Sequence, residues 1–181
     1  CKDAQAALRR GDADQALDLA EKAVVADPRS AQALTVRGLA RAALHKPADA
    51  VADFDKALEI DPKRADVYDF RGSEKFKLGL FQESVDDFDR FLEVKPDQAA
   101  GHWRRGISLY YAGRYDAGRK QFAAYEDVDA NDVENAVWHF LCAAHADGVD
   151  KARAGLLKIG KDPRVPMMTV YDLYRGEAKP E

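Results

Sequence analysis

The sequence predicts an all-α fold, a solenoid of stacked helical hairpins, and three regular spacings support this prediction. Prolines that follow Asp or Lys recur every 34 residues, at Pro28, Pro62 and Pro96. Arg-Gly pairs recur with the same spacing, beginning at Arg37, Arg71 and Arg105, and so do the aromatic residues Phe54, Phe88 and Phe122. Three residue types that share one period indicate an internal repeat. Because one repeat cannot bury its own apolar face, neighbouring repeats must stack.

Within one period, the apolar spacing predicts two helices. Val51, Phe54 and Leu58 follow the i, i+3, i+7 pattern of one helix face. This helix must end before Pro62, because proline disfavours the helical conformation in the preceding residue. A second helix follows each proline, and turn-prone residues such as those at 45–47 separate the two. We expect the repeats at about 1–30, 31–64, 65–98 and 99–132.

After residue 132 the repeat weakens, but helical patterns continue. Apolar residues of the segment 133–144 follow one helix face, and Trp138, Cys142 and His145 form a second stripe. A helix with two such stripes is packed on both sides. We expect a degenerate fifth hairpin at 133–158 and a capping helix at 166–176, since a solenoid needs terminal elements that shield its last apolar face. Residues 1–181 are therefore expected to form a single domain.

The repeat resembles the tetratricopeptide repeat over about residues 1–132. The second repeat carries the family's pattern at Leu34, Gly38, Ala50, Phe54, Ala57 and Pro62. The third carries it at Tyr68, Gly72, Phe88 and Pro96. The resemblance implies a right-handed α-solenoid of about four to five hairpins plus a C-terminal capping helix. It also implies a non-catalytic scaffold or adaptor that binds a protein or peptide partner.

Composition narrows the class of partner. The formal net charge is -4, with 32 acidic and 28 basic residues mixed along the chain, so we expect no nucleic-acid partner. The longest apolar runs are too short for a transmembrane segment. The two cysteines, Cys1 and Cys142, do not make a disulfide framework, and Cys142 is expected to be a buried packing residue.

The repeated glycines and arginines are expected to be structural. Without a Cβ, Gly38, Gly72 and Gly106 would let two helix backbones approach closely, and the repeated Phe residues would fill the space between hairpins. The arginines of the Arg-Gly pairs would pair with carboxylates of a neighbouring helix, because Asp53 and Asp87 recur at the same period. The alternative is an arginine ladder for an acidic ligand.

No pattern in the sequence predicts an enzyme. His139, Cys142 and His145 lie within seven residues, but the outer two would point about 120° apart on a helix, and a closed zinc site needs four ligands. The acidic cluster around Asp87 lacks the glycine turn of a calcium loop. Phosphate-loop, nucleophile-elbow and HExxH motifs are absent. We expect no catalytic residue, no cofactor and no metal.

The resemblance places the first helix of each hairpin on a concave face that binds the partner. Groove positions then follow from helical spacing at i, i+4, i+7 and i+8. They are Thr35, Leu39, Ala42 and Ala43 in the second repeat; Asp69, Ser73, Phe76 and Lys77, with Asp66 beside them, in the third; and Trp103, Ile107, Tyr110 and Tyr111 in the fourth. Trp and Tyr are enriched at binding hot spots. The alternative is that Tyr110 and Tyr111 pack against the fifth hairpin.

The groove positions also bear on the partner's chemistry. Some tetratricopeptide domains grip the acidic tails of chaperones with Lys and Asn. The equivalent positions here hold Thr35, Leu39, Asp69 and Ser73, so this ligand class is not expected. A peptide or helix with apolar and basic character would suit Asp66, Asp69 and the aromatic stripe better.

The first residue leaves the compartment open. Cys1 is either the lipid-carrying first residue of a mature bacterial lipoprotein or an arbitrary boundary of the sequence. The chain also resembles bacterial envelope tetratricopeptide lipoproteins that act as adaptors for cell-wall hydrolases and proteases. The location is thus cytoplasmic, or periplasmic with a lipid anchor. The alternative function is a homo-oligomerising structural component of an envelope complex, with a homodimer formed through the apolar ends or the helix at Met167–Tyr174.

Overall fold

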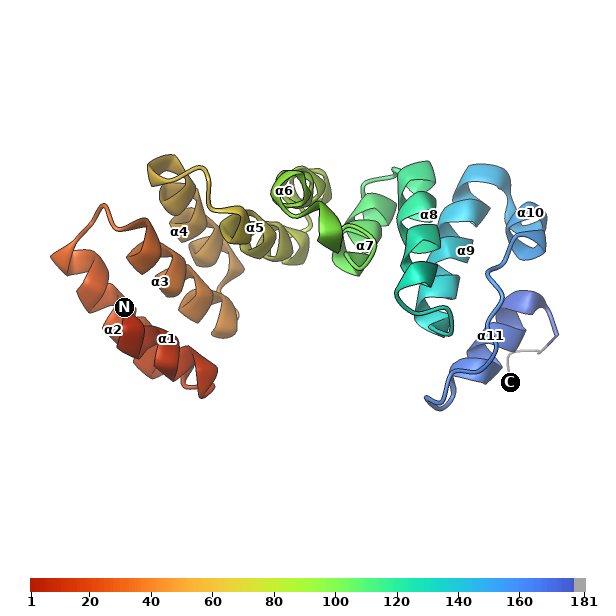
Figure 1. Ribbon diagram of the computed structural model, residues 1–181, viewed down its shortest axis with the longest axis horizontal. Helices are drawn as coiled ribbons and strands as arrows, with labels where there is room; N and C mark the ends of the chain where they lie inside the picture. Colours follow the sequence, from red (N-terminus) through yellow and green to blue (C-terminus); the bar gives the residue numbers. More distant parts are fainter. Residues whose placement is uncertain (178–181) are drawn as a thin grey trace. The chain divides into compact units, whose positions relative to one another are not determined.

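A computed structural model describes residues 1–177, and every regular element within them is helical. These residues form two compact units, one spanning Cys1–Lys95 and the other beginning at Pro96. In the first unit each helix packs on the next in chain order, and in the second unit successive helices pack as far as α9, which α10 and α11 both contact (Figure 1). The all-α class of stacked helical hairpins is therefore confirmed.

The first unit contains three helical hairpins. The helices are α1 (Lys2–Arg9) with α2 (Ala13–Ala26), α3 (Ala31–Ala43) with α4 (Pro47–Ile60), and α5 (Ala65–Lys77) with α6 (Phe81–Val94). Contacts between α2 and α3, and between α4 and α5, join the hairpins into one stack. The ring of Phe54 is fully buried in a cluster that includes Leu34 of its own hairpin and Val67 of the next.

The second unit contains one complete hairpin, a long helix and two short ones. Its elements are the 3-10 turn η1 (Pro96–Gln98), α7 (Trp103–Tyr111), α8 (Tyr115–Ala124), the 3-10 turn η2 (Tyr125–Asp127), α9 (Val133–Asp147), α10 (Val149–Ala154) and α11 (Met167–Arg175). Helix α9 packs against α8 on one side and against α10 and α11 on the other. It is thus covered on more than one face, as its two apolar stripes predict.

The helices of the first unit end where the prolines require it. Helices α2, α4 and α6 stop two residues before Pro28, Pro62 and Pro96. The intervening residue is non-helical in each case, with φ of -143° at Asp27, -137° at Asp61 and -124° at Lys95. These values lie in the region that a following proline favours.

The turns inside the hairpins repeat with the same period. Gly11, Gly79 and Gly113 have φ of 79°, 76° and 73°, a left-handed conformation that glycine adopts without steric cost. His45 occupies the corresponding place in the second hairpin with φ of 56°. A side chain in this conformation crowds its own backbone, so His45 stands at a position better suited to glycine.

The glycines of the Arg-Gly pairs permit close helix contact, as predicted. A Cβ on Gly38 would lie 2.6 Å from the ring of Phe54, and a Cβ on Gly106 would lie 2.6 Å from the ring of Phe122. In each case the Phe belongs to the second helix of the same hairpin, so its ring lies against the bare backbone of the first helix. Any larger residue would push the two helices apart.

The prediction that the repeated arginines pair with carboxylates of a neighbouring helix is confirmed in the first unit. Arg37 donates to both oxygens of Asp53 at 3.0 and 2.6 Å, and Arg71 makes the same bidentate contact with Asp87. Each of these buried carboxylates has a second cation, Arg41 Nη1 at 2.8 Å from Asp53 and Lys75 Nζ at 2.9 Å from Asp87. The guanidinium groups thus serve to tie the two helices of a hairpin together.

The fourth hairpin replaces this aspartate with Gln121. The side chain of Gln121 accepts a hydrogen bond from Arg105 Nη1 at 3.0 Å and donates one to the carbonyl of Ala99 at 2.6 Å. An amide can do both, whereas a carboxylate can only accept. Helix α7 begins at Trp103, four residues later in the repeat than α3 and α5. His102 precedes it and caps it by accepting from Arg105 N at 3.2 Å.

Candidate binding surface

The predicted groove residues of α3 contribute little exposed surface. Thr35 is 2% exposed, and its hydroxyl donates to the carbonyl of Ala31 at 2.8 Å. Leu39 and Ala42 are half-buried and pack on the core, and Ala43 is exposed. Most of the side chains assigned to the groove in this repeat are therefore occupied with packing inside the first unit.

The predicted residues of α5 form a mixed polar surface. Asp66 is exposed and lies 3.5 Å from Arg64, and exposed Lys77 pairs with Glu74 at 2.6 Å. Three further side chains are half-buried, those of Asp69, Ser73 and Phe76. The hydroxyl of Ser73 donates to the Asp69 carbonyl at 2.9 Å, and the ring of Phe76 packs edge-on against Phe81.

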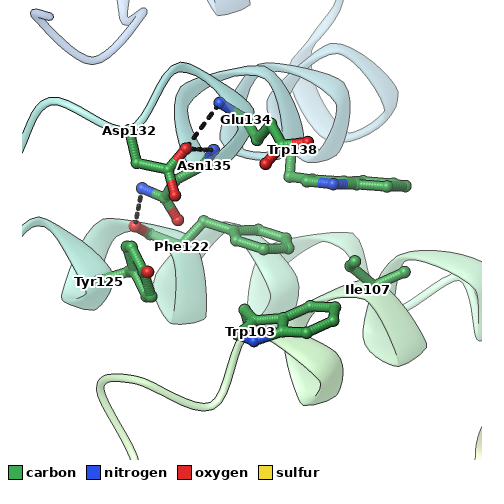
Figure 2. A pocket seen from close by; sticks show the side chains of 8 residues that line it. All are labelled: Trp103, Ile107, Phe122, Tyr125, Asp132, Glu134, Asn135 and Trp138. Carbon is green, nitrogen blue, oxygen red and sulfur yellow. Dashed lines mark hydrogen bonds between the residues drawn. The ribbon is translucent and has the colours of Figure 1, made fainter. Parts of the chain in front are cut away.

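The second unit brings two of the predicted residues into a pocket of about 350 Å³. Trp103 and Ile107 of α7 form one wall, and Figure 2 shows Trp138 of α9 across from them with Phe122 between. The complete lining is Trp103, Ile107, Phe122, Tyr125, Asp132, Glu134, Asn135 and Trp138. Trp103 is 52% exposed, a high fraction for so large an apolar ring.

Tyr110 and Tyr111 join an aromatic cluster with α9. The ring of Tyr110 lies 5.4 Å from that of Trp138, and its hydroxyl is 3.2 Å from Nε2 of His145. Burial raises the pKa of Tyr110, with a smaller contribution from Tyr115. The ring of Tyr110 therefore packs against α9, whereas the neighbouring Tyr111 remains 51% exposed.

The other end of the pocket is polar and lies at the start of α9. Asp132 caps this helix by accepting from Glu134 N at 2.9 Å, and Asn135 donates its side-chain amide to the Phe122 carbonyl at 2.9 Å. Arg164 binds this end from outside, at 2.7 Å from Asp132 and 2.9 Å from Glu134.

Arg164 also anchors the segment between α10 and α11. It pairs with the buried carboxylate of Asp162, which in addition accepts a hydrogen bond from Val133 N at 3.2 Å. Hydrogen bonding to Arg164 holds the pKa of Asp162 well below its usual range. The start of α9 is therefore held on one side by this ion-pair network and is open to the pocket on the other.

Six of the eight lining residues are outside the groove predicted from the sequence. The sequence predicts a packing role for Phe122 and Trp138, and no binding role for Tyr125, Asp132, Glu134 and Asn135. The available signal is the spacing of Asn135 and Trp138, which lie three residues apart and so share one face of α9. This signal is easily missed, because the 34-residue repeat becomes irregular after residue 132 and no longer indicates which residues of α9 face α7.

The histidines and the second cysteine are placed apart from the pocket lining. Burial raises the pKa of the Cys142 thiol to about 12, and burial together with the charge of Arg119 lowers the pKa of His139. His145 is exposed at its contact with Tyr110. Among residues 1–177, no three His, Cys, Asp or Glu side chains are grouped so that they could hold a metal ion. Nor does this part of the chain contain a helix long and apolar enough to cross a membrane.

These features define a helical-repeat protein with a lined pocket on one of its units. The family model of the tetratricopeptide repeat matches residues 1–65 and 71–136. The chain therefore belongs to the tetratricopeptide repeat family, whose members are generally non-catalytic interaction modules. No curated protein matches the sequence.

Solved structures agree with this fold. The chain is similar to YrrB, described as a TPR protein with an unusual peptide-binding site, with 19% identity over 96% of this chain and 84% of that one and a TM-score of 0.76. It is similar to MamA from Desulfovibrio magneticus RS-1, with 19% identity over 84% and 86% and a TM-score of 0.74. The first TPR of Spaghetti (RPAP3), bound to the HSP90 peptide SRMEEVD, shows 26% identity over 64% and 89% and a TM-score of 0.55.

Proposed function

We propose that this protein is a non-catalytic scaffold that binds a segment of a partner protein, with the main contact at the α7–α9 pocket of the second unit. The observation that carries the proposal is the half-exposed indole of Trp103 beside a pocket lined by four aromatic rings. A soluble protein exposes large aromatic surface at a cost, and such surface is typical of interaction sites.

Two structural neighbours support a peptide as the bound partner. YrrB has a peptide-binding site, and the RPAP3 domain was solved with a peptide bound. The latter peptide is acidic near its end, whereas the pocket of this protein has Asp132 and Glu134 on its rim. We therefore expect a partner segment of a different charge, which agrees with the apolar and basic character predicted from Asp66 and Asp69.

The test is partner capture from lysate followed by affinity measurement with Trp103→Ala. Because Trp103 is half-exposed, its removal should lower the free energy of unfolding by only about 1 kcal/mol. Loss of a central aromatic contact should weaken binding of the captured partner about 30-fold, as about 2 kcal/mol predicts. Val149→Ala serves as control, since Val149 is equally exposed at 51% but lies on α10 outside the pocket lining.

An unchanged affinity in Trp103→Ala would contradict this binding surface. Self-association is the alternative outcome, and light scattering across a range of protein concentrations decides it. A mass that doubles with concentration, and returns to that of a monomer in a Met167→Asp variant of α11, would favour the homodimer instead.

A further inference from the structure

We infer that the α7–α9 pocket takes an arginine side chain of the bound segment, an inference that rests on the proposed function. Three separate properties of the pocket favour this occupant: a buried hydrogen-bond acceptor without a donor, an excess of carboxylates at the rim, and aromatic walls. Each restricts the chemistry of the ligand in a different way.

The unsatisfied acceptor is the side-chain oxygen of Asn135. The residue is 6% exposed, and its Oδ1 is buried with no hydrogen-bond partner among the described residues. The orientation of the amide is fixed, because the Phe122 carbonyl at 2.9 Å can only accept and so requires the NH₂ group. Figure 2 shows this amide beside Tyr125 and Phe122, with its oxygen on the pocket side. A buried carbonyl oxygen of this kind calls for a donor from the ligand.

The rim sets the charge of that donor. Two carboxylates line the pocket, those of Asp132 and Glu134. The segment 125–134 around them has three more, Glu126, Asp127 and Asp129, and no Lys, Arg or His. Arg164 pairs with Asp132 and Glu134 but also with the buried Asp162, so this one cation is shared among three carboxylates. Ionised carboxylates are acceptors only. A cationic donor is thus favoured over a neutral one.

The aromatic walls of the pocket favour the guanidinium group of arginine over the ammonium group of lysine. Trp103, Phe122, Tyr125 and Trp138 present aromatic rings to the space, and Ile107 adds an aliphatic surface. A planar guanidinium stacks on such rings and carries five N–H donors, whereas an ammonium group is a compact and strongly hydrated charge. The guanidinium of Arg104 already lies 5.9 Å from the centroid of Trp103, so this indole accepts such a contact within the protein itself. Arginine fits the donor demand, the charge and the walls together.

The chain provides its own reporters for a test. Trp103 and Trp138 are its only two tryptophans, and both line the pocket. Their two indole N–H signals in a nitrogen-15 correlation spectrum therefore report on this site alone. The probes are acetyl-Ala-Leu-Arg-Leu-Ala-amide and the same peptide with citrulline or with lysine in place of arginine. Citrulline keeps the planar shape of the side chain and three of its five N–H donors, but a carbonyl oxygen replaces one NH₂ group and the charge is lost.

The arginine peptide is expected to shift both indole signals and the side-chain amide signals of Asn135, with a dissociation constant about fivefold lower than that of the citrulline peptide. Glu134→Gln should remove most of this difference, since Glu134 is an exposed rim carboxylate whose loss leaves the helix intact. Asp150→Asn removes the same charge on α10, outside the pocket lining, and should leave the difference in place.

Equal affinity for the two peptides would overturn the arginine assignment while leaving the proposed function intact, because both peptides would still bind at the indoles. Tighter binding of a lysine peptide would likewise overturn it. Absence of any indole shift with all three peptides would also overturn it. In that case the proposed function would still be judged separately, by partner capture with Trp103→Ala.

Discussion

The hairpins α3–α4 and α7–α8 share one apolar contact and differ in the polar contact next to it. In both, a Phe ring lies against a bare glycine, at Gly38 and at Gly106. In the first, a buried aspartate binds two arginines; in the second, Gln121 binds one arginine and a backbone carbonyl. The apolar contact is thus common to both hairpins, whereas the polar contact and the start of the first helix both differ.

This difference has a consequence for binding. In the first unit the groove positions of α3 are drawn into packing, and Thr35 is buried. In the second unit the late start of α7 leaves Trp103 in the first helical turn, half-exposed beside the pocket. The two hairpins thus differ in two features together. Asp53 of the second hairpin is replaced by Gln121 in the fourth, and the packed face of α3 is replaced by the exposed aromatic face of α7.

The largest expected effect tests the shared contact. Phe54→Ala and Phe122→Ala should each lower the free energy of unfolding by about 3–5 kcal/mol, because each leaves a cavity against a glycine backbone. Phe122→Ala should in addition change the tryptophan fluorescence of the folded protein, since Trp138 stacks on this ring at 6.2 Å between centroids. Urea unfolding followed by circular dichroism measures the first effect. A loss below 1 kcal/mol in either variant would contradict the shared role.

The second prediction tests the contact in which the hairpins differ. Asp53→Ala leaves Arg37 and Arg41 without their buried carboxylate and should cost about 3 kcal/mol. Gln121→Ala removes one hydrogen bond from the Arg105 guanidinium and one to a backbone carbonyl, but no buried charge, and should cost less, about 1–2 kcal/mol. Urea titrations of the two variants give the comparison. Equal losses would show that the ion pair and the amide contact stabilise their hairpins to the same extent.

A smaller and opposite effect is expected at the hairpin turns. Replacement of His45 by glycine should stabilise the protein by about 0.5–1 kcal/mol, because it relieves a left-handed conformation that the other three turns fill with glycine. The matched control is Gly79→His, which should destabilise the third hairpin by a similar amount. Thermal unfolding of both variants measures the shift. A lower midpoint in His45→Gly would show that the imidazole contributes more than the strain costs.

The smallest expected effect is a pH dependence confined to the second unit. The pKa of His139 is lowered in the folded state. Below the ordinary histidine pKa of about 6.5, the imidazole therefore binds a proton more readily in the unfolded chain than in the folded one. The stabilisation is thus present above that pH and is lost as the pH falls below it. Hydrogen exchange of α8 and α9 amides at pH 7.5 and pH 5.5 measures this. His139→Gln should reduce the dependence and His45→Gln should not.

Much of the fold follows from the sequence, because the residues that determine it act within a single repeat. The Phe-Gly contact, the helix ends before proline and the pairing of Arg37 with Asp53 all depend on local spacing. The pocket depends on less regular features. Gln121 bonds a backbone carbonyl that precedes α7, and α9 lies outside the regular repeat. The approach of Asn135 and Trp138 to Trp103 therefore requires the three-dimensional structure.

The packing of Cys142 against Gly118 makes this thiol a probe for the rate at which α8 and α9 separate. The thiol is fully buried, and a Cβ on Gly118 would lie 2.9 Å from its sulfur, so α8 and α9 must separate before any reagent can reach it. Its raised pKa of about 12 also keeps it in the unreactive thiol form while buried. The rate of the slow phase of alkylation should therefore report how often these two helices separate. The exposed Cys1 should give a separate, fast phase.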